Sequence, residues 1–129
     1  MELIHGVYQS PGEEGKRGFE DLDCYKLAMD VMVNVHQMVK SLPIDEKYDL
    51  IQQIRRSSKS ISANIAEATG REGIKEQKYH FSVAKGSIYE TVSLLYIIKN
   101  RKYISSEIFE NLYKEFDEIA MMLHGLIRK

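Results

Sequence analysis

Polar side chains repeat at helical spacing in the stretch QQIRRSSKSISANIAEATGR, from Gln52 to Arg71, and further polar residues follow in the next predicted helix. Carboxylates beside cations can act as an acid–base pair or form a structural network that fixes helix register. We predict the structural network, with Asn64, Glu67 and Glu90 buried or half-buried, because an unpaired buried charge is costly. Its members are Arg56, Asn64, Glu67, Arg71, Ser87 and Glu90. A catalytic role would require Glu67 and Glu90 to share a solvent-open pocket.

A second set of residues has the composition of a nucleic-acid-binding surface. Lysines and tyrosines alternate along the helix predicted after residue 74, and two cations four residues apart precede them. Lysines contact phosphates, and tyrosines stack on unpaired bases. The candidates are Arg55, Lys59, Lys75, Lys78, Lys85, Tyr89 and Lys99. They predict weak, salt-sensitive binding to structured RNA or DNA if several copies form a continuous belt. The alternative is a solvated or subunit-facing surface without nucleic-acid contact.

Other chemical motifs are missing from the sequence. The four histidines have neither i,i+3 nor i,i+4 spacing, and the single cysteine, Cys24, cannot build a structural zinc site. There is no GxSxG elbow and no phosphate-binding loop. We therefore expect no catalytic residue, no metal and no cofactor, and predict that the protein is not an enzyme.

Composition limits the class of protein further. A chain of 129 residues, 43% hydrophobic and 29% charged, suits one globular domain. It has no apolar run long enough for a membrane span, and one cysteine fits a reducing compartment, so we expect a cytoplasmic protein. The formal net charge of −1 gives no global attraction to nucleic acid, but residues 55–85 hold seven basic and three acidic side chains. Any such binding must be local.

Apolar residues recur every three or four positions in four segments, which predict helices near 20–41, 45–69, 75–99 and 105–128. On the second helix, the residues predicted to face the core are Ile51, Ile54, Ser58, Ile61, Ile65 and Ala68. Short connections favour an all-α, up-down-up-down antiparallel four-helix bundle over 19–129, preceded by an extended or mobile leader at 1–18. Ser58 and Ser62 on the second helix, with Ser82 and Gly86 on the third, predict a close approach of these helices. The first helix has an apolar arc wider than one seam, which indicates either another subunit or deep burial within one chain.

The motifs also resemble a known family. The run R-R-S-S-x-S-I-x-x-N-I-A-E-x-x-G-R at 55–71, the run A-K-G-S-x-x-E at 84–90 and the turn at 95–103 resemble the four-helix-bundle proteins of 23S rRNA intervening sequences. That family is similar to the accessory variability protein of diversity-generating retroelements. One departure is Ala68, where the family more often carries glycine.

The resemblance implies a ring, commonly of five subunits, without known enzymatic activity. For the retroelement branch it also implies a nucleic-acid or reverse-transcriptase partner. That branch is strongly basic and this sequence is not, so fold and oligomerisation carry over with more weight than nucleic-acid binding. We expect a cytoplasmic homo-oligomeric scaffold or adaptor, a homopentamer by the resemblance. The alternative is a purely structural or protein-binding oligomer.

Overall fold

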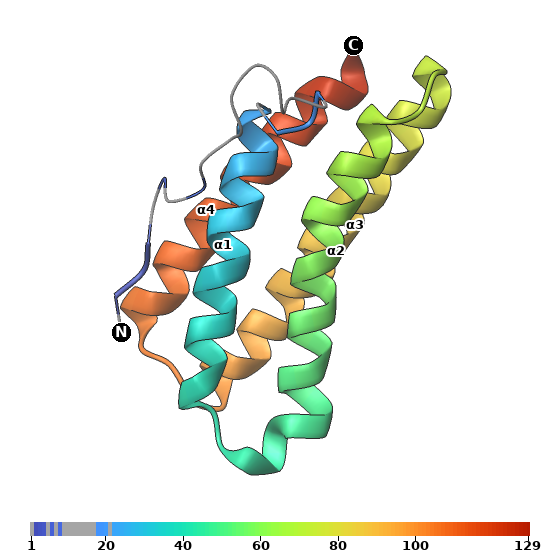
Figure 1. Cartoon of the computed structure of the whole chain (residues 1–129). Coiled ribbons are helices and arrows are strands. Elements are labelled where there is room, and N and C mark those ends of the chain that lie inside the picture. Colours follow the sequence, from blue (N-terminus) through green and yellow to red (C-terminus); the bar gives the residue numbers. More distant parts are fainter. Residues whose placement is uncertain (1, 5, 7, 9–17, 21) are drawn as a thin grey trace.

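The computed structural model describes residues 2–4, 6, 8, 18–20 and 22–129. This part of the chain forms helices and no strand, which confirms the predicted all-α, up-down-up-down antiparallel bundle (Figure 1). The helices are α1 (Asp23–Met38), α2 (Gln52–Thr69), α3 (Ile74–Asn100) and α4 (Ser106–Arg128). Most of the predicted leader, residues 1, 5, 7 and 9–17, lies outside the described residues, as does residue 21.

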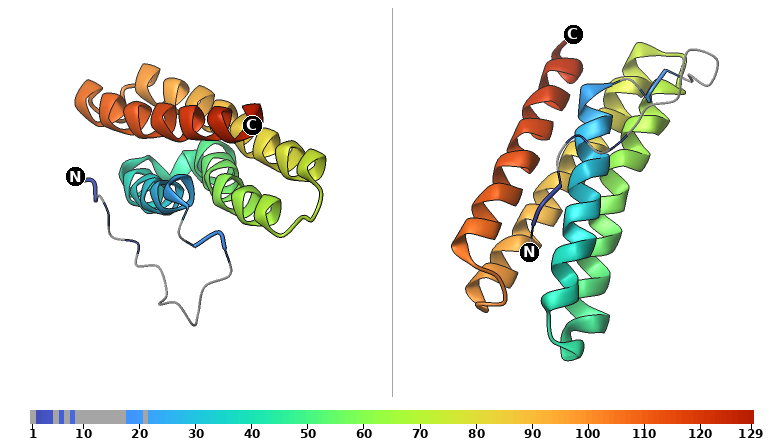
Figure 2. Two further views of the ribbon diagram at one scale, coloured as in Figure 1. Left: turned by 90° about the horizontal axis from the view of Figure 1, so that it is seen from above. Right: turned by 60° about the vertical axis from the view of Figure 1, so that its left-hand side comes forward.

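The four helices lie in two layers, with α1 and α2 in one and α3 and α4 in the other (Figure 2). Each helix packs on two neighbours, so that the helices follow one another around the bundle. The α1–α2 and α3–α4 connections are at the same end (Figure 1). There Arg101 Nη1 lies 2.6 Å from Glu46 Oε2 and joins the two connections.

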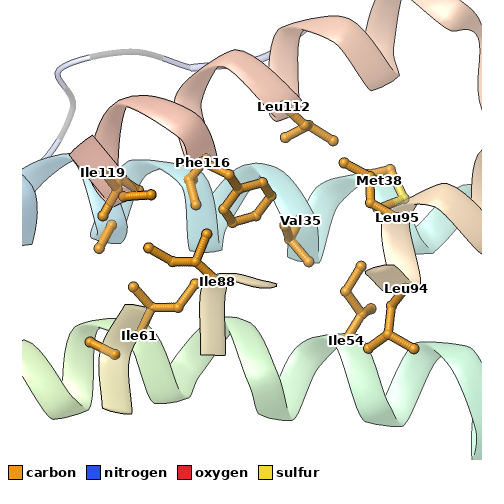
Figure 3. Close-up of a cluster of buried hydrophobic side chains, with 14 of the residues drawn as sticks. Val35, Met38, Ile54, Ile61, Ile88, Leu94, Leu95, Leu112, Phe116 and Ile119 are labelled. Atoms are coloured by element: carbon orange, nitrogen blue, oxygen red, sulfur yellow. The ribbon is translucent and has the colours of Figure 1, made fainter. Parts of the chain in front are cut away.

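The core consists of aliphatic side chains and phenylalanines from all four helices (Figure 3). On α2 the predicted seam is correct, because Ile54, Ile61 and Ile65 are fully buried. Ile88 of α3 lies beside Ile61 and Phe116 of α4, while Ile54 lies beside Leu94 (Figure 3). Burying each such side chain contributes about 1.5–3 kcal/mol, so the period of the sequence determines which faces meet.

The segment before α2 differs from the predicted helix over 45–69. Short turns occupy it instead: 3-10 turns at Val39–Ser41 and Ile44–Glu46, and a π turn at Lys47–Ile51. Ile44 and Tyr48 are more than 80% exposed, so packing does not favour a regular helix at these positions. Leu50 and Ile51 are both buried at the end of the π turn. The first helix also differs from the predicted 20–41, because α1 begins at Asp23 and ends at Met38.

The prediction that α3 approaches α2 through its small residues Ser82 and Gly86 was wrong. Ser82 and Gly86 are exposed, and a Cβ added to Gly86 would meet no atom within 4 Å. The two helices meet through a different face of α3, where Thr91 Oγ1 donates a hydrogen bond to Ser57 Oγ of α2 at 2.8 Å. Apolar spacing alone did not distinguish these two faces.

The wide apolar arc of α1 is partly covered by the same chain. Tyr8 and Phe19 pack edge-on against the Tyr25 ring, with centroids 5.5 and 4.9 Å away. This contact supports the intrachain interpretation for that end of the arc.

Candidate nucleic-acid interface

A basic hollow of about 540 Å³ opens on the surface where α2 begins. We use this name for the site lined by Lys47, Tyr48, Gln52, Arg55, Arg56 and Lys59. The π turn supplies the first two residues and the first two turns of α2 supply the others. Four of the six side chains are cationic and none is acidic. An anion with several negative groups is the ligand that this composition favours.

Tyr48 gives the basic hollow an aromatic surface. Its side chain is 82% exposed, and Lys47 Nζ lies 5.5 Å from the centroid of its ring. An exposed ring beside cations has little role in the fold of a single chain. It is suited to stacking on an unpaired base, while the neighbouring cations hold phosphates.

The cations of the basic hollow affect α1 as well. The pKa of His36 is lowered from its usual 6.5, first by burial and then by the positive charges of Lys59 and Arg55. The sites predicted at Arg55 and Lys59 therefore lie together at the α1–α2 edge. Arg56 has an acidic partner, because its Nη2 lies 2.5 Å from Glu90 Oε2 of α3.

The predicted α3 candidates do not continue this site. Lys85 Nζ lies 3.2 Å from His124 Nδ1 of α4, and Lys99 Nζ lies 4.4 Å from the centroid of the Phe109 ring. Both lysines are half-buried at the α3–α4 edge, and Tyr89 is exposed there with Lys85 Nζ 5.9 Å from its ring. The extension of one stripe from α3 to Arg55 and Lys59 was therefore wrong within a single chain.

Two further candidates, Lys75 and Lys78, lie near the start of α3. This is the opposite end of the bundle from the basic hollow (Figure 1). Lys75 is exposed and Lys78 is half-buried. The seven predicted residues thus occupy three places on one chain.

The predicted polar network consists of separate pairs. Glu67 pairs with Arg71 one turn later, and Glu90 pairs with Arg56 across the α2–α3 seam. Glu67 and Glu90 are both exposed, so the expectation that they would be buried or half-buried was wrong. Their positions beside the core seam point them outward, where each carboxylate finds an arginine at the surface.

The amide and hydroxyl members of the network lie deeper. Asn64 is half-buried and donates to the Ser60 carbonyl at 2.8 Å and to Ser60 Oγ at 3.0 Å. Ser60 Oγ in turn lies 2.8 Å from Ser87 Oγ of α3. The structural role of these residues remains a prediction.

The arrangement required for catalysis by carboxylates is not found around Glu67. Its surface hollow, of about 380 Å³, is bordered by Ala63, Ala66, Gly70 and Arg71, and Glu90 is not among its lining residues. Burial raises the pKa of the Cys24 thiol to about 11, so its thiolate is scarce at neutral pH. Among the described residues, no group of three or more His, Cys, Asp or Glu is placed to hold a metal ion.

Comparison with known proteins identifies the family. The family model described as "23S rRNA-intervening sequence protein" matches residues 20–125, which include α1, α2, α3 and most of α4. The chain belongs to the 23S rRNA-intervening sequence protein family. A search of curated proteins gave no match.

A solved structure is similar to this 23S rRNA-intervening sequence protein. It is a protein of unknown function from the S23 ribosomal protein family of Bacteroides thetaiotaomicron VPI-5482. The two chains are 25% identical with a TM-score of 0.75, and the match covers 82% of this chain and 99% of the neighbour. Neither description names an enzymatic activity. In the described part of this family member, no helix has the length and hydropathy needed to span a bilayer.

Sequence reasoning missed several polar residues of this family member. Lys47 and Tyr48 were not singled out because the segment was assigned to a regular helix. The sequence feature that could have indicated them is a lysine next to a tyrosine shortly after Pro43. Asp30 and Asn34, on the apolar α1, are buried with exposed fractions of 4% and 1%. Two polar residues four apart within an apolar helix were the signal for this buried pair.

Proposed function

We propose that this protein is a non-enzymatic adaptor that binds structured RNA through the basic hollow. The observation that supports the proposal is the cluster of four cations around one exposed tyrosine. Cations supply salt-dependent attraction to phosphates, and an exposed ring favours RNA with unpaired bases. The family description connects these proteins with 23S rRNA, so a structured RNA is the probe of choice.

Within the basic hollow we assign two roles. Arg55 and Lys59 hold phosphates, since both lie on α2 one turn apart. Tyr48 stacks on an unpaired base, and Lys47 contacts the adjacent phosphate. One hollow provides few contacts, so binding by a single copy is weak and sensitive to salt.

We infer that copies of the chain associate through the outer face of α3. Tyr79, Tyr89 and Tyr96 are 64%, 59% and 44% exposed. Exposed small residues alternate with them at spacings of three and four, which is the pattern of a seam between two helices. The small residues are Ser82, Gly86 and Ser93. Assembly would bring several basic hollows onto one particle, and the family resemblance favours five copies.

The RNA-binding proposal is tested by fluorescence anisotropy with a labelled stem–loop RNA whose loop is unpaired. We expect saturable binding by micromolar protein at low salt, and weaker binding as salt is raised. A fully paired duplex of the same length is the control and should bind less tightly, because it offers no base to Tyr48. Absence of binding at micromolar protein and low salt would contradict the proposal.

Self-association is tested separately by light scattering over a range of protein concentrations. We expect a mass several times that of one chain, and a loss of mass in Tyr89→Glu, which places a charge in the α3 seam. Glu118→Gln on the exposed face of α4 is the matched control. A mass of one chain at every concentration would contradict the assembly.

A second function remains open because the exposed α3 face is a separate feature. A stable oligomer that binds no RNA would favour a protein-binding or purely structural role.

A further inference from the structure

Two buried polar side chains on α1 face the N-terminal residues of the chain. Asp30 and Asn34 are one helical turn apart and almost fully buried, with exposed fractions of 4% and 1%. Asn34 Nδ2 also donates a long hydrogen bond to Glu115 Oε1 of α4 at 3.5 Å. Buried polar groups need hydrogen-bond partners, and here backbone groups of the N-terminal segment are among them.

The hydrogen bonds involve the backbone of alternate residues. Asn34 Oδ1 accepts from the Ile4 N–H at 2.8 Å, while Asn34 Nδ2 donates to the Ile4 carbonyl at 2.9 Å. Asp30 Oδ2 accepts from the Gly6 N–H at 2.6 Å, and its Oδ1 accepts from the Tyr8 N–H at 3.1 Å. In these bonds α1 contacts main-chain groups and no side chain of the segment. Hydrogen bonds to the main chain supply affinity that does not depend on the side chains of the bound segment.

Among the described residues of the segment, Leu3 and Tyr8 also make side-chain contacts. Leu3 packs against the edge of the core, and the Tyr8 ring lies edge-on to Tyr25. Gly6 has φ +60° with open space around it. Glycine adopts this backbone conformation without strain, whereas a β-branched residue does not.

We propose that Asp30 and Asn34 form a binding site for the main chain of a peptide, and that its ligand is the main chain of Ile4, Gly6 and Tyr8 of the same chain. These three residues act as a detachable N-terminal strap on α1. The family match begins at residue 20, so the strap lies outside the matched region. Release of the strap would open the site to another peptide.

The first test is amide hydrogen exchange in the full-length chain. We expect the Ile4, Gly6 and Tyr8 amides to exchange at least tenfold more slowly than in the free peptide MELIHGVY, yet much faster than the core amides of α2. Asn34→Leu should return the Ile4 amide toward the free-peptide rate. Asn64→Leu is the matched control, because Asn64 donates to Ser60 of its own helix, and it should leave the strap unchanged.

Two results of this exchange experiment would overturn the proposal. Exchange of the three amides at the free-peptide rate in the unmodified chain would show that no site exists. Exchange only through global unfolding would show that the segment is an integral part of the bundle.

The second test asks whether the site binds a peptide supplied in trans. Gly6→Val in the full-length chain disfavours the bound strap by roughly five- to thirtyfold and leaves the bundle unchanged. Labelled MELIHGVY should then bind at least fivefold more tightly to Gly6→Val than to the unmodified chain. Adding Asn34→Leu to Gly6→Val should abolish this binding. No peptide binding by Gly6→Val, with its strap amides exchanging at the free rate, would overturn the peptide site.

Discussion

Cations have different surroundings at the α3–α4 edge and at the α1–α2 edge of the bundle. At the α3–α4 edge, Lys85 and Lys99 are half-buried against His124 and Phe109. At the α1–α2 edge, Lys59 is exposed and borders the open basic hollow. Both edges carry cations at helical spacing, but at the α1–α2 edge the cations border an open hollow beside an exposed ring.

This difference shows that a row of lysines in the sequence indicates positive charge, but does not indicate whether the lysines are accessible to a phosphate. A cation packed on an aromatic ring contributes to the fold, and moving it onto a phosphate would sacrifice that contact. Lys59 is exposed at the basic hollow, so it would exchange mainly water for an anion. We therefore expect RNA affinity to depend on the α1–α2 edge and fold stability to depend on the α3–α4 edge.

The largest effect that would sharpen this comparison is expected from Tyr48→Ala. Stacking of one base on an aromatic ring is worth about 1–3 kcal/mol, so affinity for a stem–loop RNA should fall about tenfold. Tyr89→Ala at the opposite edge is the matched control, compared at concentrations where light scattering gives both variants the same mass, and we expect less than about a twofold change. Both tyrosines are more than half exposed, so neither change should unfold the chain. Anisotropy titrations measure the two affinities, and a larger loss for Tyr89→Ala would reverse the comparison.

A smaller effect on stability is expected from Lys99→Met. This change retains the aliphatic stem and removes the cation above the Phe109 ring, which should lower the free energy of unfolding by about 0.5–1 kcal/mol. Lys59→Met should change it by less than about 0.5 kcal/mol, since Lys59 is exposed. Urea denaturation monitored by circular dichroism measures both. Equal losses would remove the distinction between the two edges.

The pH dependence of His36 gives a third comparison. Its folded-state pKa is lowered, so below about pH 6.5 the unfolded chain binds protons more readily than the folded chain. The contribution of His36 to stability is therefore complete above that pH and is lost as the pH falls through the folded-state pKa. Inorganic phosphate bound at the basic hollow should offset Lys59 and Arg55 and raise the pKa of His36.

Nuclear magnetic resonance titration of His36, with and without phosphate, measures this change. In the double variant Arg55→Gln/Lys59→Gln, phosphate should no longer change the titration. An unchanged His36 titration in the unmodified chain would indicate that the basic hollow does not hold anions.

The smallest effect is expected from Lys75→Gln/Lys78→Gln. Ten residues of α2, Ser60–Thr69, lie between the basic hollow and this end, and a helix of that length spans about 15 Å. RNA affinity should therefore change by less than about twofold at 0.15 M salt, where charges this far apart are screened. A loss as large as that from changes in the basic hollow would restore the continuous belt expected from sequence.

Sequence reasoning predicted the features that depend on local periodicity. Ile54, Ile61 and Ile65 were placed in the core because one helix face repeats regardless of what covers it. The same reasoning could not place Glu67 and Glu90, since a position beside a core seam can point inward or outward. Burial at such positions depends on the neighbouring helix, which spacing does not determine.

Two other features depended on parts of the chain that periodicity does not connect. Tyr48 becomes exposed because the π turn replaces the predicted helix around it. Asp30 and Asn34 are satisfied partly by residues more than twenty positions earlier in the chain. Such contacts require the fold before they can be recognised.

The salt dependence of RNA binding tests the central claim most directly. For the unmodified chain, the logarithm of the binding constant should fall linearly with the logarithm of salt concentration. In Arg55→Gln/Lys59→Gln the slope should be smaller by about 1.4–1.8, since two phosphate contacts at about 0.7–0.9 each are lost. Identical slopes for the two proteins would show that the basic hollow does not contact RNA phosphates, and would contradict the proposed function.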